Sequence, residues 1–389
     1  MIRDKIRGSL FGGAVGDALG YPVEFIGEYS IFSKYGDRGI TSYELNKNGK
    51  AVISDDTQMV LFTANGLLAG NTAFCMQGKE GFPRLDVEQA YLDWLLTQIS
   101  SRQQVNGHER FTKEGGYSWL LDVPELYARR APGITCLRAL EGGTYGKEDF
   151  IRNPRNDRKG CGGIMRVAPV ALMYRPDENC NIDIKTLDWE AAQIAAITHG
   201  HSLGYMPAAV VSHIITRILT SDSQVNLKEI VLDSRDAMKE IFSADENLDE
   251  LVRIIDLAVS LSENSRDDLK NIHALGEGWV AEETLGISLY CALKYQEDFS
   301  AGIIASVNHK GDSDSTGAVT GNILGALVGY EAIEEKWKQD LELSDVILEM
   351  ADDLYQGCLM EERGYDSDQV WMTKYVRMHR YAKGSGSIR

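Results

Sequence analysis

Positive charge is scarce in this sequence. It has 40 Lys and Arg residues against 58 Asp and Glu residues, which gives a formal net charge of −18. A protein that follows the phosphate backbone of a nucleic acid needs a broad electropositive surface. The charge balance therefore disfavours nucleic acid as a partner.

Cysteine is also sparse, and the six cysteines include no C-x-x-C pair. The sequence thus lacks that signature of a zinc or redox site. A disulfide framework is not expected in a chain long enough to bury a full core. We therefore expect a reducing, cytoplasmic location.

Long apolar runs are missing too. No run approaches the roughly 18 residues that span a bilayer, so we expect no membrane association. Residues 10–15 are apolar and follow basic residues, which superficially resembles a secretory signal. Asp17 interrupts this stretch after too few residues, and the pattern is more typical of a first helix.

Strand-like alternation is scarce, whereas apolar residues recur at helical spacing through most of the chain. Only residues 41–53 favour a short strand pair. The spacing predicts helices at 2–19, after 54–56, at 85–99, two within 190–219 joined near Gly204, two within 227–258, and at 284–295 and 317–337. Residues 103–163 are rich in glycine, aromatic and charged residues, which favours a loop region with a ligand surface.

The pattern predicts one all-α domain. The 389 residues allow two or three domains at about 150 residues each. However, the sequence shows no internal repeat and no linker rich in Pro or Ser ahead of residue 383. We therefore expect a single helical domain over residues 1–382 and a mobile tail over residues 383–389. A hydrophobic content of 43% is typical of a globular protein with a sizeable core.

Two acidic clusters stand directly before apolar helical segments. One is residues 54–56 (Ser-Asp-Asp) and the other is residues 312–315 (Asp-Ser-Asp-Ser). One interpretation is helix capping, in which side-chain oxygens accept free backbone N–H groups. The other is a site for hard divalent cations, because closely spaced carboxylates repel one another and such cations prefer oxygen ligands. If the fold brings both clusters together, they could hold two ions.

The second cluster has a further interpretation. The pattern Asp-x-Asp-x-Ser/Thr also occurs in the nucleophile loop of aspartate-dependent phosphatases, where the first Asp follows a parallel strand. No β-α-β alternation surrounds Asp312, so phosphate-ester chemistry ranks second.

Five motifs follow one another in order between residue 8 and about residue 329. They are residues 10–25 (LFGGAVGDALGYPVEF), 54–57 (SDDT), 130–135 with 160–166 (RAPGIT and GCGGIMR), 198–205 (THGHSLGY) and 311–315 (GDSDS). Together they resemble the ADP-ribosylglycohydrolase family, which includes the enzymes that reactivate dinitrogenase reductase and the hydrolases of ADP-ribosylarginine and ADP-ribosylserine.

The resemblance implies an all-α, orthogonal helical bundle with a binuclear metal site in a central cleft. It implies two Mg²⁺ ions, with Mn²⁺ as an alternative. The residues that would face the metals are Ser54, Asp55, Asp56, Asp312, Asp314 and Ser315. Ser54 and Ser315 stand where Thr is common, which keeps the hydroxyl group.

The same resemblance implies hydrolysis of an N- or O-glycosidic bond between ADP-ribose and a protein side chain, with Glu24, Asp55, Asp56 and Asp314 as catalytic residues. Such cleavage passes through an oxocarbenium-like state and needs a positioned water and help for the leaving group. Glu24 would lie beside the reacting ribose and align the water or accept its proton. The alternative for Glu24 is a solvated acid just after a helix end.

Substrate contacts are expected from Gly160, Cys161, Gly162, Gly163, His199 and Gly311. A chain with few Lys and Arg residues has little positive charge available to neutralise a pyrophosphate. We therefore expect backbone N–H groups of the glycines, followed by a helix N-terminus, to bind it; a plain turn is the alternative. Cys161 stands where many family members have Asn, which puts an amide contact in doubt.

The remaining candidates are a histidine and three aromatic residues. His199 is expected on a helix, either as a core residue or as a donor to a phosphate or ribose oxygen. Tyr117, Trp119 and Tyr145 lie in the loop-rich region and could stack on adenine or pack locally.

The sequence thus predicts a metal-dependent hydrolase of ADP-ribosylated proteins, with ADP-ribosyl-arginine as the expected substrate. Two alternatives stay open. The first is a non-catalytic regulator that binds ADP-ribose, against which the intact acids at every metal position argue. The second is the metal-dependent phosphate-ester hydrolase.

Overall fold

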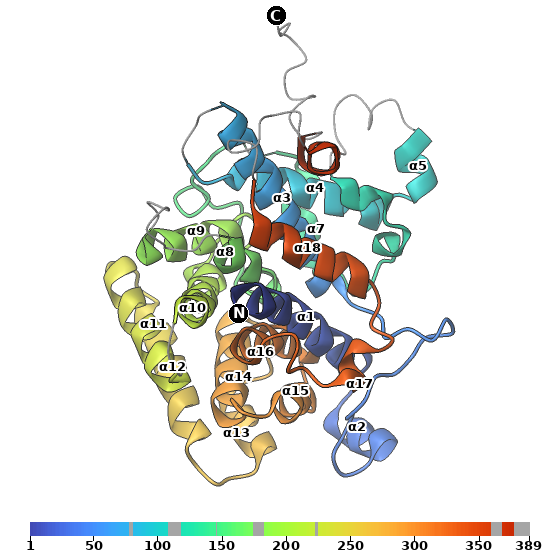
Figure 1. Ribbon diagram of the computed structural model, residues 1–389. Helices are drawn as coiled ribbons and strands as arrows, with labels where there is room; N and C mark the ends of the chain where they lie inside the picture. The colour runs from blue at the N-terminus through green and yellow to red at the C-terminus, as the bar shows by residue number, and fades with distance from the viewer. Residues whose placement is uncertain are drawn as a thin grey trace, which may run out of the picture.

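A computed structural model describes residues 1–77, 81–107, 118–144, 146–173, 183–221, 225–358 and 368–376. These residues form helices and no named strand, which confirms the all-α prediction (Figure 1). The predicted tail, residues 383–389, lies outside the described residues, as do Tyr117 and Tyr145.

Helices and short helical turns follow one another along the described residues. They are α1 (Ile2–Gly20), η1 (Tyr21–Val23), α2 (Glu28–Tyr35), α3 (Asp55–Gln77), α4 (Arg84–Ile99), α5 (Arg102–Gly107), η2 (Trp119–Asp122), η3 (Pro124–Tyr127), α7 (Ile134–Glu141), η4 (Cys161–Gly163), α8 (Ala168–Met173), α9 (Ile184–Ala196), α10 (Ser202–Thr220), α11 (Leu227–Ile241), α12 (Leu248–Ser262), α13 (Asp268–Leu275), α14 (Ala281–Lys294), α15 (Phe299–Val307), α16 (Ser313–Val328), α17 (Glu335–Lys338), α18 (Ser344–Gln356), α20 (Gln369–Trp371) and η5 (Met372–Val376).

The centre of the fold is a close contact between α1 and α16, which lie side by side in Figure 1. Glycines of the two helices meet in antiparallel pairs: Gly8 with Gly325, Gly12 with Gly321, and Gly16 with Gly317. A Cβ on any of these glycines of α1 would overlap the carbonyl oxygen of its partner. The backbones therefore touch directly, and the C-terminal end of α1 lies beside the N-terminal end of α16.

Two helix boundaries differ from the sequence prediction. The helix expected over 317–337 ends before Gly329, which adopts a φ of 82°, and Trp337 belongs to the separate helix α17. The break expected near Gly204 lies earlier, where the His201 side chain accepts a hydrogen bond from the backbone N–H of Leu203 and caps α10. Gly204 is therefore inside α10.

The predicted strand pair over residues 41–53 was wrong. This segment forms a single antiparallel bridge between Leu45 and Ala51. The Asn46 side chain accepts hydrogen bonds from the backbone N–H groups of Asn48 and Lys50, which closes a tight turn. Ala51 then bridges to Leu341 in parallel, so the segment leaves its hairpin partner after one pair.

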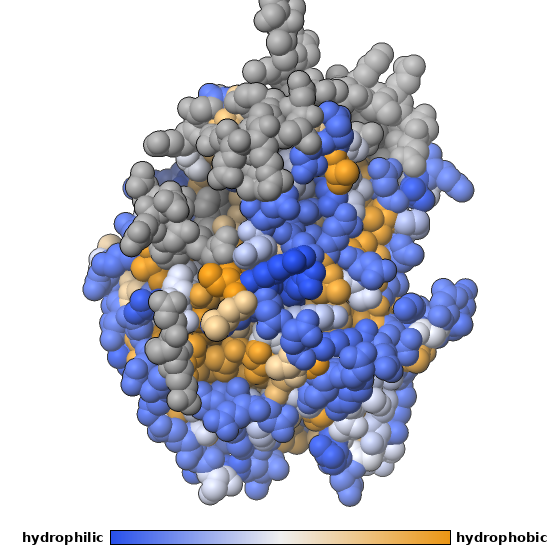
Figure 2. All heavy atoms as spheres, viewed as in Figure 1, coloured by the Kyte–Doolittle hydropathy of each residue, from blue (hydrophilic) through white to orange (hydrophobic). Residues whose placement is uncertain are grey.

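Two helices, α3 and α10, are long and apolar enough to cross a membrane, in contrast to the sequence prediction. In each, most of the apolar window is buried inside the protein, 78% in α3 and 89% in α10. Helix α3 packs against α4 and α8, and α10 packs against α9 and α14. Both helices therefore have the burial typical of core helices. The face of the molecule drawn in Figure 2 is mainly hydrophilic, with apolar patches between the polar side chains.

We expect the substitution Gly16→Ala to destabilise the protein. An added methyl group would overlap the Gly317 carbonyl oxygen, so the helices must separate. Overpacking of this kind costs about 1–3 kcal/mol, which outweighs the gain of up to about 1 kcal/mol in helix propensity. Urea unfolding measures the loss. Gly142→Ala is the control, because a Cβ there meets nothing within 4 Å; equal stability of the two variants would contradict the prediction.

Candidate active site

A cavity of about 490 Å³ lies where the end of α1, the starts of α3 and α16, and the loops before α7 and η4 meet. Its lining includes the carboxylates of Glu24, Asp55, Asp56, Asp312 and Asp314. The two acidic clusters, which are far apart in the sequence, therefore share one cavity.

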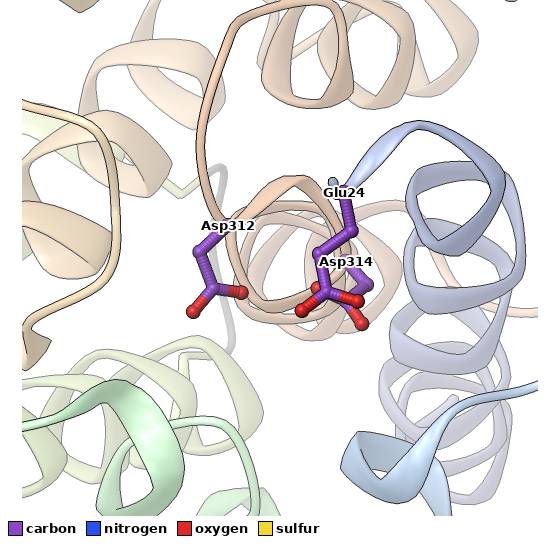
Figure 3. A group of neighbouring side chains, drawn as sticks. All are labelled: Glu24, Asp312 and Asp314. Atoms are coloured by element: carbon purple, nitrogen blue, oxygen red, sulfur yellow. The ribbon is translucent and has the colours of Figure 1, made fainter. Parts of the chain in front are cut away.

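Three of the carboxylates form a compact group (Figure 3). Oxygens of Glu24, Asp312 and Asp314 lie within 4.8 Å of one another, and all three residues are buried. Glu24 follows the short turn η1 after α1, while Asp312 is the N-cap residue of α16 and Asp314 belongs to its first turn. The antiparallel contact of α1 with α16 therefore brings these side chains together.

Helix capping, one of the two interpretations of the acidic clusters, describes part of the structure. The Asp312 side chain accepts a hydrogen bond from the backbone N–H of Ser315 and caps α16. The Ser54 hydroxyl oxygen accepts one from the N–H of Asp56, at 3.2 Å, at the start of α3. Ser315 lines the cavity, whereas Ser54 is fully buried outside the lining.

Asp17 is a buried residue that orients the first cluster. From α1, its carboxylate accepts hydrogen bonds from the backbone N–H of Ser54 at 2.9 Å and that of Thr57 at 3.0 Å. Burial, followed by repulsion from Asp314, raises the pKa of Asp17 to about 7. This role was missed in the sequence, where Asp17 stands out only as an interruption of an apolar run. The signal was an acid at a position whose helical neighbours are all apolar or glycine.

The loop before α7 is held against the start of α3. The Asp55 carboxylate accepts a hydrogen bond from the N–H of Gly133 at 3.2 Å, and the N–H of Asp55 donates to the carbonyl of Arg130 at 3.3 Å. The Arg130 guanidinium forms an ion pair with Glu342 and donates to the carbonyl of Ile53. Arg130, the first residue of the motif at 130–135, thus has a structural role.

Burial and mutual repulsion raise the pKa values of the cavity carboxyl groups. Burial, followed by the charges of Asp314 and Asp312, raises the pKa of Glu24 to about 11. Burial and Asp314 also hold the pKa of Asp55 and that of Asp56 well above the usual range. The described residues that line the cavity include no Lys or Arg to compensate these charges.

The donor set of the cavity fits a hard divalent cation. Glu24 Oε2 and Asp56 Oδ2 are buried oxygens without a hydrogen-bond partner among the described residues. Buried carboxylates are normally hydrogen-bonded, paired with a cation, or bound to a metal. Because the lining offers carboxylate and hydroxyl oxygens in one place, the cluster has the chemistry of a site for a hard divalent cation.

His199 is held in a defined orientation. The Arg166 guanidinium donates to Thr198 Oγ1 at 2.7 Å, and Thr198 Oγ1 lies 2.9 Å from Nδ1 of His199. Because arginine can only donate, the hydroxyl proton of Thr198 is available for Nδ1, an arrangement compatible with the tautomer that carries its proton on Nε2. Burial, with a smaller contribution from Arg166, lowers the pKa of His199 to about 3, so the ring stays neutral.

The glycines predicted to contact the substrate, at 160, 162 and 163 in the glycine loop and at 311, differ in whether they line the cavity. Gly160 and Gly162 line the cavity, and a Cβ on Gly162 would lie 2.8 Å from Cε1 of His199. Gly163 and Gly311 lie outside the lining, because Gly163 packs against the Gly204 carbonyl of α10 and Gly311 against the backbone at residue 277. These two predicted substrate contacts are thus packing positions in the structure.

The helix N-terminus at the cavity is not the predicted one. The glycines form the single turn η4, and α8 begins only at Ala168. Gly133, Ile134 and Thr135, at the start of α7, line the cavity instead, and α7 has no side-chain cap. The sequence gives no sign that α7 is the helix whose N-terminus lies at the cavity, because α7 follows an irregular loop and has no capping side chain.

Cys161 also lines the cavity. Its thiol donates a hydrogen bond to Asp312 Oδ2 at 2.7 Å. Burial and the charges of Asp312 and Asp56 hold the pKa of this thiol well above its usual range, so it stays a neutral donor.

Two aromatic residues that were missed in the sequence lie at the cavity. Phe25 and Trp279 line it, and their rings stack with centroids 5.9 Å apart. Trp119, which was considered for adenine stacking, lies outside the lining, and the Lys374 ammonium lies over its ring.

These observations describe an all-α protein with a carboxylate-lined cavity, and comparisons with known proteins give its class. The family model described as ADP-ribosylglycohydrolase matches residues 1–364, so the chain belongs to this family. The chain is accordingly a glycosyl hydrolase that acts on ADP-ribosylated acceptors.

The relatives of the chain include three named hydrolases. ADP-ribosylhydrolase ARH3 of Mus musculus is 26% identical over 208 residues, which cover 47% of this chain and 53% of that protein, so the chain spans about half the length of this relative. ADP-ribosyl-[dinitrogen reductase] glycohydrolase of Rhodospirillum rubrum is 24% identical over 88% of this chain and 92% of its own. ADP-ribosylarginine hydrolase Tri1 of Pseudomonas putida is 23% identical over 90% of this chain and 78% of its own.

One solved structure, titled "ADP-ribosylglycohydrolase-related protein complex", has the same fold. Its TM-score is 0.55 at 22% sequence identity, and the match covers 91% of this chain and 98% of that one. The helical bundle predicted from the sequence is therefore confirmed.

We expect Thr198→Val to weaken ADP-ribose binding while the fold is retained. The variant removes the hydroxyl that is hydrogen-bonded to Nδ1 of His199, so the ring loses the contact that orients it. Loss of one oriented hydrogen bond should raise the Kd for ADP-ribose by roughly tenfold in calorimetry. Thr220→Val, at the end of α10, is the matched control. An unchanged Kd would show that His199 is a packing residue.

Proposed function

We propose that this protein is a magnesium-dependent hydrolase that releases ADP-ribose from modified arginine side chains of proteins. The observation that supports this most is the convergence of two distant acidic clusters in one cavity. The printed names of two relatives, an ADP-ribosylarginine hydrolase and an ADP-ribosyl-[dinitrogen reductase] glycohydrolase, point to ADP-ribosylated proteins, and the first of them to arginine.

Asp55, Asp56, Asp312 and Asp314 would hold the metal, with the hydroxyl oxygen of Ser315 as a further ligand; Ser54, which the sequence also predicts as a ligand, lies outside the cavity lining. Two Mg²⁺ ions, or Mn²⁺ in their place, would supply Lewis-acid activation of water and of the ribose oxygens. Ionised carboxylates are needed for this role, and cation charge lowers the pKa values that burial raises.

Glu24 and Asp56 each have a buried oxygen without a partner among the described residues, and Glu24 is the one outside the set proposed to hold the metal. Its Oε2 is buried, has no partner among the described residues, and lies beside Asp314. It can orient a water molecule and accept its proton while the bond from the anomeric carbon to the acceptor nitrogen breaks. The electron pair of that bond goes to the guanidino nitrogen, which takes up a proton as it leaves.

The pyrophosphate would lie along the start of α7 and the glycine loop, which both line the cavity. Backbone N–H groups at the start of α7 and along the glycine loop can bind phosphate oxygens without a positive side chain. The protonated Nε2 of His199 adds one neutral donor. Neutral donors suit this cavity, because its net charge is already negative.

The two alternatives have less support. Asp312 follows the helix α15 and a short loop, so it does not have the strand-borne position of a phosphatase nucleophile. A pure binder would have no need for buried carboxylate oxygens without partners. The cytoplasmic location and an ADP-ribosylated protein as the partner remain part of this proposal.

We expect purified protein to release ADP-ribose from an ADP-ribosyl-arginine peptide in Mg²⁺ and to stop doing so in EDTA. An ADP-ribosyl-serine peptide, assayed in parallel by mass spectrometry, tests the acceptor. Faster release from serine would replace arginine in the proposal. No metal-dependent release from either peptide would contradict it.

We expect Asp314→Asn to lose metal binding and hydrolysis together. The neutral amide keeps the shape and removes one charge from the cluster. Calorimetry with Mn²⁺ should show weaker binding, and kcat/KM should fall on the order of a hundredfold or more. Asp149→Asn, outside the cavity, is the matched control. Full activity of Asp314→Asn would exclude this residue from the metal site.

A further inference from the structure

The mouth of the cavity carries two aromatic side chains that the reaction outlined above does not use. Phe25 is 69% exposed and Trp279 is 40% exposed. Their rings stack at an interplanar angle of 24°, which makes one apolar wall, and both line the cavity. Large apolar side chains left in solvent beside a polar site are typical of a binding surface.

Backbone connections fix this aromatic pair at the carboxylate end of the cavity. Phe25 directly follows Glu24 in the sequence. The carbonyl of Trp279 accepts a hydrogen bond from the N–H of Cys161 at 3.3 Å, and the N–H of Asp312 donates to the carbonyl of residue 277 at 2.8 Å. The segment before α14 is thus tied to both the glycine loop and the second acidic cluster.

The position of the pair limits what it can bind. The bond that breaks lies at the carboxylates, so the groups next to them are the reacting ribose and the leaving group. Adenine is separated from that bond by a ribose, two phosphates and a second ribose, and therefore lies at the far end of the substrate. The ribose hydroxyls match oxygen ligands rather than aromatic faces. The leaving group is the part of the substrate that remains for the aromatic pair.

Building on the proposed function, we propose that the exposed face of the Phe25–Trp279 pair binds the guanidinium of the ADP-ribosylated arginine. A guanidinium is planar and cationic and stacks on aromatic rings, with tryptophan as the strongest partner. A serine acceptor has neither a charge nor a plane to stack. The aromatic pair would therefore select the acceptor residue.

A neighbouring hollow gives the polypeptide of the substrate a route away from the cavity. Trp279 also lines a second hollow of about 550 Å³, together with His273, Glu277, Glu283 and Lys310. Lys310 is neutralised by its ion pair with Glu277, at 2.6 Å. The hollow therefore favours a peptide segment of positive rather than negative charge, which suits the surroundings of a modified arginine.

The test uses Phe25→Leu and Trp279→Leu, which remove the aromatic faces and keep apolar side chains. We expect kcat/KM for an ADP-ribosyl-arginine peptide to fall about tenfold in each variant, mainly through KM, as expected for the loss of a cation–π contact. Trp279→Phe keeps a ring and should recover most of the loss. Tyr29→Leu is the matched control, because Tyr29 is 87% exposed on α2 outside both hollows.

Calorimetry with free ADP-ribose separates the competing outcomes. If Phe25→Leu and Trp279→Leu weaken ADP-ribose binding by the same factor as the peptide, the pair contacts the ADP-ribose part and the inference is overturned. Unchanged kcat/KM for the arginine peptide also overturns it, while the proposed function stands. If the wild-type protein cleaves no arginine peptide, the proposed function fails. In that case, binding of the arginine peptide is measured in a Glu24→Gln background to test the aromatic pair separately. Weaker binding in Phe25→Leu and Trp279→Leu supports the inference about the pair, and equal binding overturns it.

Discussion

Direct contact between the backbones of α1 and α16 is the interaction on which the site depends. Each paired glycine removes a side chain that would hold the helices apart. Because the pairing is antiparallel, the end of one helix meets the start of the other, and both ends carry acids. The carboxylates of Glu24 and Asp314 can lie together only while this spacing is kept.

A second layer of support comes from hydrogen bonds that cross between elements. Asp17 in α1 accepts backbone hydrogen bonds at the start of α3, and Asp55 in α3 accepts one from the loop before α7. Arg166 supports Thr198, which in turn orients His199. Each of these residues acts through a neighbour, so the cavity is built on a rigid framework of helix ends.

Much of this could be predicted from the sequence, because the relevant signals are local. Helical spacing gives α1 and α4 to within a residue or two, and the clusters around Asp55 and Asp314 are visible as short polar runs before apolar segments. The family resemblance then correctly predicts the fold. Local signals were weaker where boundaries depend on caps, as with His201 at the start of α10.

The features that escaped prediction depend on contacts between distant residues. Nothing near Gly311 distinguishes a glycine that packs against a carbonyl from one that binds a ligand. The pairing of Phe25 with Trp279 requires knowledge of which loop lies beside which helix end. The buried acid Asp17 had a visible signal, but its partners at the start of α3 emerge only in three dimensions.

The antiparallel glycine contact also has a consequence for biogenesis. Helix α1 (Ile2–Gly20) is synthesised well before α16 (Ser313–Val328), the partner that covers its glycines. Until then the bare glycine face of α1 has nothing to pair with, and non-local contacts of this kind slow folding. The cavity needs residues from both helices, so it can form only after α16 has been synthesised.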